Sequence, residues 1–273
     1  MLMRLLLGLF ALGLAGYSLC WVGDSHPEIK NKIESLLHTG SFHTLEIRHT
    51  AEQIMNANRQ ALLKDGQHQF LDPSLKFYPY LLMEVKYILS DHKTKEGVVL
   101  WDLNDGEMVL DVRGWEKTHG FGDCLKAGTD RYEFKVINTL AKKGGSSDRE
   151  ALSKALHVDN DVLDQWIDSC RRKKLIVQTG NRYRLHLENP KLKTLPSTTI
   201  DEPLVTQSHR GAARASKQFS FSQIERLTRA AFGHEFAIRR TTDVYLPVHC
   251  IVVQNPDGSI HTSLWNALNG QPF

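Results

Sequence analysis

The feature that most constrains the fold is a short phrase that occurs twice in the chain. "GVVLWDLNDGE" covers residues 97–107, and "TSLWNALNGQ" covers residues 262–271. Each phrase reads Leu-Trp, then Asp or Asn, then a spacer, and then a Gly followed by an acid or an amide. The two tryptophans, Trp101 and Trp265, are about 164 residues apart. A fold for this chain therefore has to accommodate one strand-and-turn pattern in two places.

The residues before each phrase also correspond. "FYPYLLMEVKYIL" (77–89) and "VYLPVHCIVV" (244–253) are apolar runs typical of β-strands. Proline is best tolerated at the first residue of a strand, so we expect the two strands to be entered through Pro79 and Pro247. A turn then separates each run from its Leu-Trp strand, which predicts two hairpins.

Further upstream, each region has the signature of a helix start. A hydroxyl residue stands three positions before a glutamine at Thr50 and again at Ser220, which is the capping-box form. Apolar residues at helical spacing follow both. We interpret the shared order as an internal duplication of a helix followed by about three antiparallel strands. Two unrelated α+β segments that share a few residues are the alternative. In a duplication, the tryptophans are expected to anchor a core or an interface.

The N-terminus carries a long apolar run. Residues 5–23 are 19 residues without a charge, which at about 1.5 Å per residue just span a hydrocarbon core of about 30 Å. A secretory signal has a similar start, and a buried core helix is a third interpretation. We expect residues 1–23 to be a signal peptide or a membrane anchor. Because Arg4 favours a cytoplasmic N-terminus, the body is expected on the non-cytoplasmic side.

Residues 131–188 have a different pattern. Apolar residues at helical spacing predict three helices, the second with a capping box of Ser147 and Glu150. Two extended runs in "LIVQTGNRYRLHL" follow them. This order of helix, helix, turn, helix and hairpin resembles a winged-helix domain over residues 131–187. The resemblance implies that the third helix enters the major groove of DNA and that the hairpin lies near phosphate.

The charges of this domain argue against binding to DNA. The third helix carries Asp159, Asp161, Asp164 and Asp168, and these would meet phosphate with the wrong sign. The candidate binding residues are the cations that follow it: Arg171, Arg172, Lys173, Lys174, Arg182 and Arg184. Cations at a helix C-terminus also complement the helix dipole. We therefore expect a structural or protein-contact role for this domain, with nucleic acid disfavoured as a partner.

These patterns divide the chain into five parts. Residues 189–219 lose their periodicity and contain three prolines, which predicts a linker. The parts are an apolar segment (1–23), a first α+β unit (24–130), a winged-helix-like domain (131–188), the linker (189–219) and a second α+β unit (220–273). The predicted fold class is α+β: two related units of a helix plus antiparallel strands flank a winged-helix-like domain, and an N-terminal hydrophobic helix precedes them.

Catalytic chemistry has one weak candidate, the loop "WEKTHGFGDC" (115–124). It holds His119, Asp123 and Cys124 near two glycines, and a cysteine beside a histidine can form an activated thiolate. A glycine-bearing turn that joins the first unit to the middle domain is the simpler interpretation, and we favour it.

Composition further limits the classes of function that this chain can have. The four cysteines have no metal-binding spacing, so neither a metal nor a cofactor is expected. A net charge of +3 is too small to imply nucleic acid or membrane partners by itself. We predict a non-enzymatic, membrane- or envelope-associated interaction or scaffold protein with a protein partner. The alternatives are an enzyme that uses the His119/Cys124 loop and a membrane-tethered DNA-binding regulator.

Overall fold

The computed structural model describes residues 40–64, 67–89, 92–187, 190–192, 195–208, 212–233 and 235–273. These residues form a mixed α+β structure. The predicted signal peptide or anchor, residues 1–23, lies outside the described residues. Within the described ranges, no helix combines the length and the apolar character needed to span a membrane.

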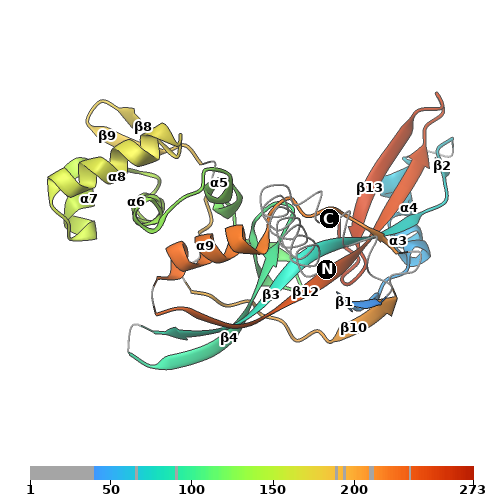
Figure 1. Cartoon of the computed structure of the whole chain (residues 1–273). Helices are drawn as coiled ribbons and strands as arrows, with labels where there is room; N and C mark the ends of the chain where they lie inside the picture. Colours follow the sequence, from blue (N-terminus) through green and yellow to red (C-terminus); the bar gives the residue numbers. More distant parts are fainter. Residues whose placement is uncertain are drawn as a thin grey trace, which may run out of the picture.

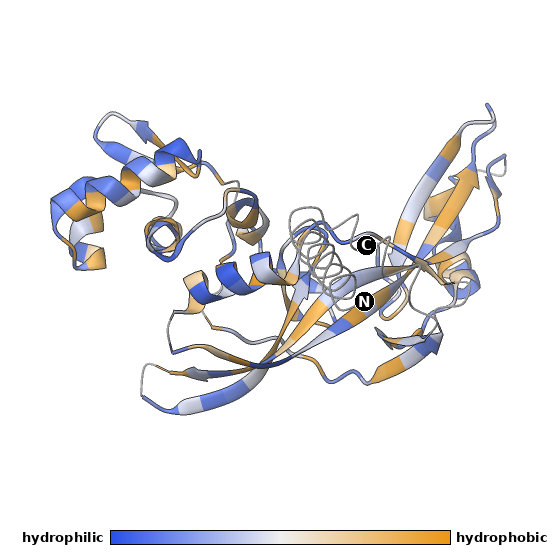
Figure 2. Ribbon diagram, viewed as in Figure 1, coloured by the Kyte–Doolittle hydropathy of each residue, from blue (hydrophilic) through white to orange (hydrophobic). Residues whose placement is uncertain are grey.

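Ten of the described strands form one curled sheet (Figure 1). They are β1 (Ser41–Leu45), β2 (Gln69–Phe70), β3 (Ser74–Ile88), β4 (Thr94–Asp102), β5 (Met108–Asp111), β6 (Glu116–Lys117), β10 (Leu204–Ser208), β11 (Ala213–Arg214), β12 (Ala237–Gln254) and β13 (Ile260–Asn266). At its centre, β3 and β12 pair antiparallel. Each continues into its own hairpin, β3 with β4 and β12 with β13, so the hairpins extend in opposite directions (Figure 1). Hydrophobic residues are concentrated in β3 and β12 where these two strands pair at the centre of the sheet (Figure 2).

The two prolines lie inside these strands and not at their starts, contrary to the prediction. The carbonyl of Pro79 accepts a hydrogen bond from Leu103 N at 3.1 Å, and that of Pro247 accepts one from Ala267 N at 3.0 Å. In an antiparallel strand, the nitrogen and the carbonyl of one residue face the same side. The nitrogen of each proline therefore faces the end of its own hairpin, beyond the last paired residues. No hydrogen bond between the strands is lost there, although proline has no N–H to donate.

The turn after each Leu-Trp strand is held by the same set of hydrogen bonds. In the first turn, Gly106 N bonds Asp102 O (3.1 Å), Asp102 N bonds Glu107 O (2.9 Å), Asn104 N bonds Asp102 Oδ1 (2.7 Å) and Glu107 N bonds Asp105 Oδ1 (2.8 Å). In the second, Gly270 N bonds Asn266 O (2.9 Å), Asn266 N bonds Gln271 O (2.9 Å), Leu268 N bonds Asn266 Oδ1 (2.9 Å) and Gln271 N bonds Asn269 Oδ1 (3.0 Å). Each of these four bonds in the first phrase thus has a counterpart at the same place in the second.

Two helices begin where the two halves of the sheet meet. They are α3 (Ala51–Ala57) and α9 (Phe221–Phe232), and both predicted capping boxes, at Thr50 and Ser220, are confirmed. The two residues before Thr50 both donate their N–H to Ala267 O at 2.9 Å, and the two before Ser220 both donate to Leu103 O at 2.9 Å. The start of each helix is therefore held by the turn that belongs to the other half.

Packing follows the same crossed arrangement. Ile54 of α3 clusters with Ile251 and Trp265 of the β12–β13 hairpin. Ile224 of α9 belongs to the large cluster that contains Trp101 of the β3–β4 hairpin. Both tryptophans are buried, as expected for core anchors: Trp101 is 0% exposed and Trp265 is 8% exposed. Each helix thus covers the hairpin of the other half.

The middle segment forms three helices and a separate three-stranded sheet. They are α6 (Arg131–Lys142), α7 (Arg149–Leu156), α8 (Asn160–Arg172), β7 (Ser146–Asp148), β8 (Ile176–Thr179) and β9 (Arg182–Leu185). The predicted cap of the second helix is wrong by one residue. Asp148 is the N-cap and accepts a hydrogen bond from Ala151 N at 2.8 Å, while Ser147 lies in β7 and pairs with Tyr183. Aspartate caps a helix as well as serine does, so strand pairing decides which residue takes the position.

The predicted linker contains regular structure. We call residues 195–208 the strap; its strand β10 pairs antiparallel with β1. Thr198 is buried in the strap, accepts a hydrogen bond from Leu100 N (2.9 Å) and donates one to Val109 O (2.6 Å). The strap therefore lies along the sheet and is held to it. The strap has few apolar residues, so its sequence did not predict that it packs on the sheet.

Candidate functional site

The candidate catalytic residues do not form one site. Cys124 lies in the short helix α5 (Phe121–Lys126) and is fully buried, and this burial raises the pKa of its thiol to about 12. His119 is exposed, and its backbone N–H bonds Lys191 O at 3.1 Å. Asp123 is a surface carboxylate 3.6 Å from Lys126. Among the described residues, no hydrogen bond joins the exposed imidazole to the buried thiol, so a nucleophile–base pair is not formed.

Glu107 organises this loop. Its carboxylate accepts hydrogen bonds from Thr118 Oγ1 (2.7 Å) and from the backbone N–H groups of Gly120 (2.8 Å), Phe121 (3.3 Å) and Gly122 (2.9 Å). A carboxylate is favourable at a helix N-terminus, where N–H groups have no partner within the helix. Sequence reasoning missed this role, although Glu107 is the last residue of the first repeated phrase. The loop is thus a structural junction built around a buried acid.

A charge cluster lies beside the first turn, around the buried carboxylate of Asp102. Lys117 Nζ contacts Asp102 Oδ2 at 2.6 Å and Asp105 Oδ2 at 2.9 Å. Burial and the neighbouring Asp102 raise the pKa of Asp105. Burial acts to lower the pKa of Lys117, but the two carboxylates outweigh it and raise the pKa. The ammonium therefore stays charged and closes the first turn.

The structure separates the six candidate binding cations. Arg171 pairs with Asp168 at 3.3 Å, Lys173 pairs with buried Glu133 at 2.7 Å, and Arg182 Nε donates to Ser146 Oγ at 3.1 Å. Lys173 and Lys174 line a cavity of about 390 Å³ between α5 and the middle domain. Arg184 lines a different cavity of about 530 Å³, and Arg172 is exposed. Half of the set is therefore engaged in contacts within the chain.

An exposed aromatic surface was not predicted. We call Tyr132, Val162 and Trp166 the aromatic patch. Tyr132 is 51% exposed and stacks on Trp166 with ring centroids 4.8 Å apart, and Val162 is 41% exposed one turn before Trp166 on α8. The signal that could have found the patch is Tyr132, which lies outside the apolar stripe of α6.

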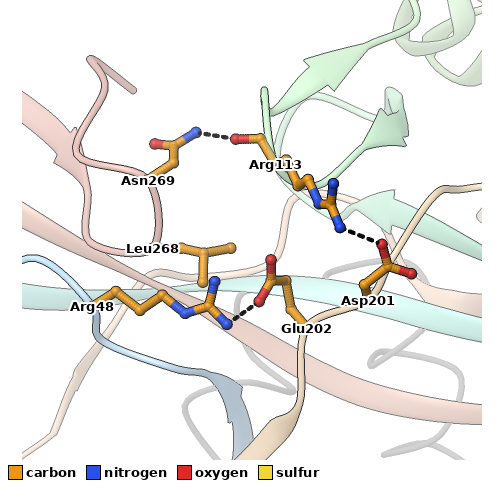
Figure 3. A pocket seen from close by; sticks show the side chains of 6 residues that line it. All are labelled: Arg48, Arg113, Asp201, Glu202, Leu268 and Asn269. Atoms are coloured by element: carbon orange, nitrogen blue, oxygen red, sulfur yellow. Dashed lines mark hydrogen bonds and ion pairs between the residues drawn. The ribbon is translucent and has the colours of Figure 1, made fainter.

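Four distant segments line an open polar pocket of about 450 Å³, which we call the strap pocket (Figure 3). It is lined by Arg48, Arg113, Asp201, Glu202, Leu268 and Asn269. Arg48 precedes α3, Arg113 follows β5, the two acids belong to the strap, and Leu268 and Asn269 belong to the second turn. Two opposite-charge pairs face each other across it: Arg48 with Glu202, and Arg113 with Asp201 at 2.8 Å.

Comparison with protein-family models, with curated proteins and with solved structures found no match for this chain. Within the described ranges, no three His, Cys, Asp or Glu side chains gather as metal ligands do. Function must therefore be inferred from the geometry of the chain itself, of which the aromatic patch and the strap pocket are two exposed features.

The burial of the two inner thiols predicts their reactivity. Desolvation raises the pKa of both Cys124 and Cys170 to about 12. Since the thiolate is the reactive form, at pH 8 these residues should react with iodoacetamide about 10³-fold more slowly than a thiol of ordinary pKa. Peptide mapping by mass spectrometry, with the urea-unfolded chain as control, measures each rate. Rapid labelling of Cys124 in the native protein would revive the thiolate hypothesis.

Proposed function

We propose that this chain is a non-enzymatic, membrane- or envelope-associated interaction protein. In this proposal, two related α+β units form a rigid frame, and the frame presents a winged-helix-like domain to a protein partner. The observation that carries the proposal is the aromatic patch of Tyr132, Val162 and Trp166.

The relation between the two units is supported by their matching bonds. Four turn hydrogen bonds correspond one to one, both helices start with the same capping box, and each helix start bonds the turn of the other half. Strands β1 and β11 add a further correspondence, because each lies parallel to the central strand of the other half, β12 and β3. So many matches in the same order favour duplication over chance. Two units whose helices each pack on the other unit cannot separate without breaking the packing of both helices. Such units would form a rigid frame.

The winged-helix-like assignment of residues 131–187 is supported by the order of elements. Helix α6, strand β7, helices α7 and α8, and the β8–β9 hairpin follow one another as the resemblance implies. Helix α6 packs on α9 of the frame (Figure 1). The cores of the two parts are continuous. The domain would therefore be held in a fixed orientation.

The outward face of α8 favours a protein partner over DNA. Asp161 and Asp168 are exposed there, and Asp164 pairs with Arg149 at 2.7 Å. Carboxylates repel phosphate, whereas an aromatic pair is the kind of group that contributes most to protein interfaces. Exposed aromatic and branched apolar side chains rimmed by polar residues are typical of such surfaces.

A photo-crosslinking amino acid placed at Val162 of the full-length protein should yield one discrete protein adduct in cells. Tyr132→Ser should reduce the adduct at least tenfold, because removing one side of the stack takes away about 1.4 kcal/mol or more of contact. The matched control places the same amino acid at Gln178, an exposed residue of β8 in the same domain, and should yield no such adduct.

Other results would contradict the proposal. An adduct with nucleic acid would favour the DNA-binding regulator, and a protein adduct unchanged by Tyr132→Ser would remove the patch from the interface. The same cells report the targeting half of the proposal. The full chain should fractionate with membranes or outside the cytoplasm, and a chain lacking residues 1–23 should be cytoplasmic and soluble. Identical fractionation of the two chains would contradict a targeting role.

A further inference from the structure

The second turn lacks the acids of the first, because amides stand at the three corresponding positions: Asn266, Asn269 and Gln271 in place of Asp102, Asp105 and Glu107. In the first turn, Asp105 binds the ammonium of Lys117 at 2.9 Å. The corresponding residue of the second turn is Asn269, whose Nδ2 donates to Arg113 O at 3.0 Å and whose Oδ1 accepts from Gln271 N at 3.0 Å. The first turn is thus closed by an internal salt bridge, and the second turn puts no charge into its pocket.

The guanidinium of Arg113 is available to an incoming carboxylate. Its partner is Asp201, and the side chains are 71% and 62% exposed. An ion pair this exposed is worth about 0–1 kcal/mol. Arginine binds carboxylates through two parallel N–H groups. A ligand carboxylate can therefore replace Asp201 on Arg113 at small cost to the fold.

Glu202 offers the opposite charge. Its side chain is 7% exposed and pairs with Arg48. Figure 3 shows one carboxylate oxygen directed at Arg48 and the other directed into the space between Leu268 and Arg113. A buried carboxylate gains from a second charged hydrogen-bond donor, because low dielectric strengthens the interaction. An ammonium group is such a donor.

The remaining wall is apolar. Leu268 is buried and points into the pocket between the two charged pairs (Figure 3). The volume of about 450 Å³ is in the range of small-molecule sites, which combine an apolar wall with a few polar groups that fix orientation.

We infer that the strap pocket binds a small zwitterion, an α-amino acid or a dipeptide with an apolar side chain. The carboxylate binds Arg113 in place of Asp201, the ammonium binds the second oxygen of Glu202, and the side chain lies on Leu268. This ligand site is independent of the protein contact proposed for the aromatic patch.

Calorimetric titration of the full-length protein in detergent tests the inference. The probes are L-leucine and L-leucyl-L-alanine, compared with N-acetyl-L-leucine, which lacks the ammonium, and L-leucinamide, which lacks the carboxylate. At least one zwitterion should bind, and both half-charged probes should bind at least tenfold more weakly. Failure of both zwitterions to bind, or equal binding of either half-charged probe, would overturn the inference.

Two variants locate the binding. Arg113→Gln should weaken binding of the zwitterion at least tenfold with little change in the melting temperature, since its ion pair is exposed. Asn269→Asp should also weaken binding, because a carboxylate in the wall of the pocket repels the carboxylate of the ligand and no longer donates to Arg113 O. The matched control is Arg240→Gln, which removes a comparable exposed ion pair with Glu84 outside the pocket. If the control weakens binding as much as the pocket variants do, the zwitterion binds elsewhere.

Discussion

Replacing Trp101 with alanine is expected to lower the free energy of unfolding by about 3–5 kcal/mol, the range for a large aromatic residue removed from a core. Trp101 is 0% exposed and belongs to the cluster that joins the β3–β4 hairpin, α9 and the helices α6, α7 and α8. Trp265→Ala should cost less, because Trp265 keeps 8% exposure and belongs to a smaller cluster with Ile54 and Ile251. Urea unfolding followed by circular dichroism measures both. A larger loss for Trp265 would contradict the burial argument.

The same two variants test the crossed packing of the helices. Trp101→Ala should increase amide hydrogen exchange in α9, which belongs to the second half of the chain, and leave α3 protected. Trp265→Ala should increase exchange in α3 and leave α9 protected. If each helix packed on the hairpin that follows it in sequence, the two patterns would be reversed. Exchange resolved by peptide therefore separates an intertwined frame from two side-by-side units.

The local elements of this frame could be predicted from the sequence, and the crossing could not. The capping boxes at Thr50 and Ser220 were predictable because a hydroxyl and an amide three residues apart satisfy N–H groups within the same turn. Periodicity also indicated which side of α9 is apolar. It does not say which hairpin will cover that side, because both hairpins carry an equivalent tryptophan. That choice depends on long-range bonds such as those to Leu103 O and Ala267 O.

The candidate sites were harder to predict, for a related reason. His119 and Cys124 are five residues apart in sequence, yet His119 is exposed and Cys124 lies on the buried side of α5. The strap pocket joins Arg48, Arg113 and Glu202 from three distant segments. The strap itself lies in residues 189–219, for which the sequence predicts a linker. A pocket assembled by long-range pairing has no local spacing signature. Only the exchange of acids for amides between the two phrases, such as Asp105 for Asn269, is visible in the sequence.

The largest effect in the junction is expected at Glu107. Glu107→Ala removes the acceptor of Thr118 Oγ1 and of the backbone N–H groups of Gly120 and Gly122. Because each buried donor left without a partner costs about 1–3 kcal/mol, we expect a loss of about 3–5 kcal/mol in the free energy of unfolding. Glu107→Gln should lose less, since its amide oxygen can still accept from the two glycines.

Gln271 provides the matched control, because it is the counterpart of Glu107 in the second phrase but its side chain is exposed. Gln271→Ala should change the free energy of unfolding by about 0.5 kcal/mol or less, as expected for a surface substitution. Urea unfolding gives the three values, and amide exchange in residues 121–126 reports whether α5 is released. Gly122 packs closely against the turn, because a Cβ added there would lie 2.2 Å from Asp105 O. A larger residue at position 122 therefore cannot fill the space left by the Glu107 side chain. If Glu107→Ala and Gln271→Ala cost the same, Glu107 does not hold the first turn to α5, and the difference between an acid in one phrase and an amide in the other has another cause.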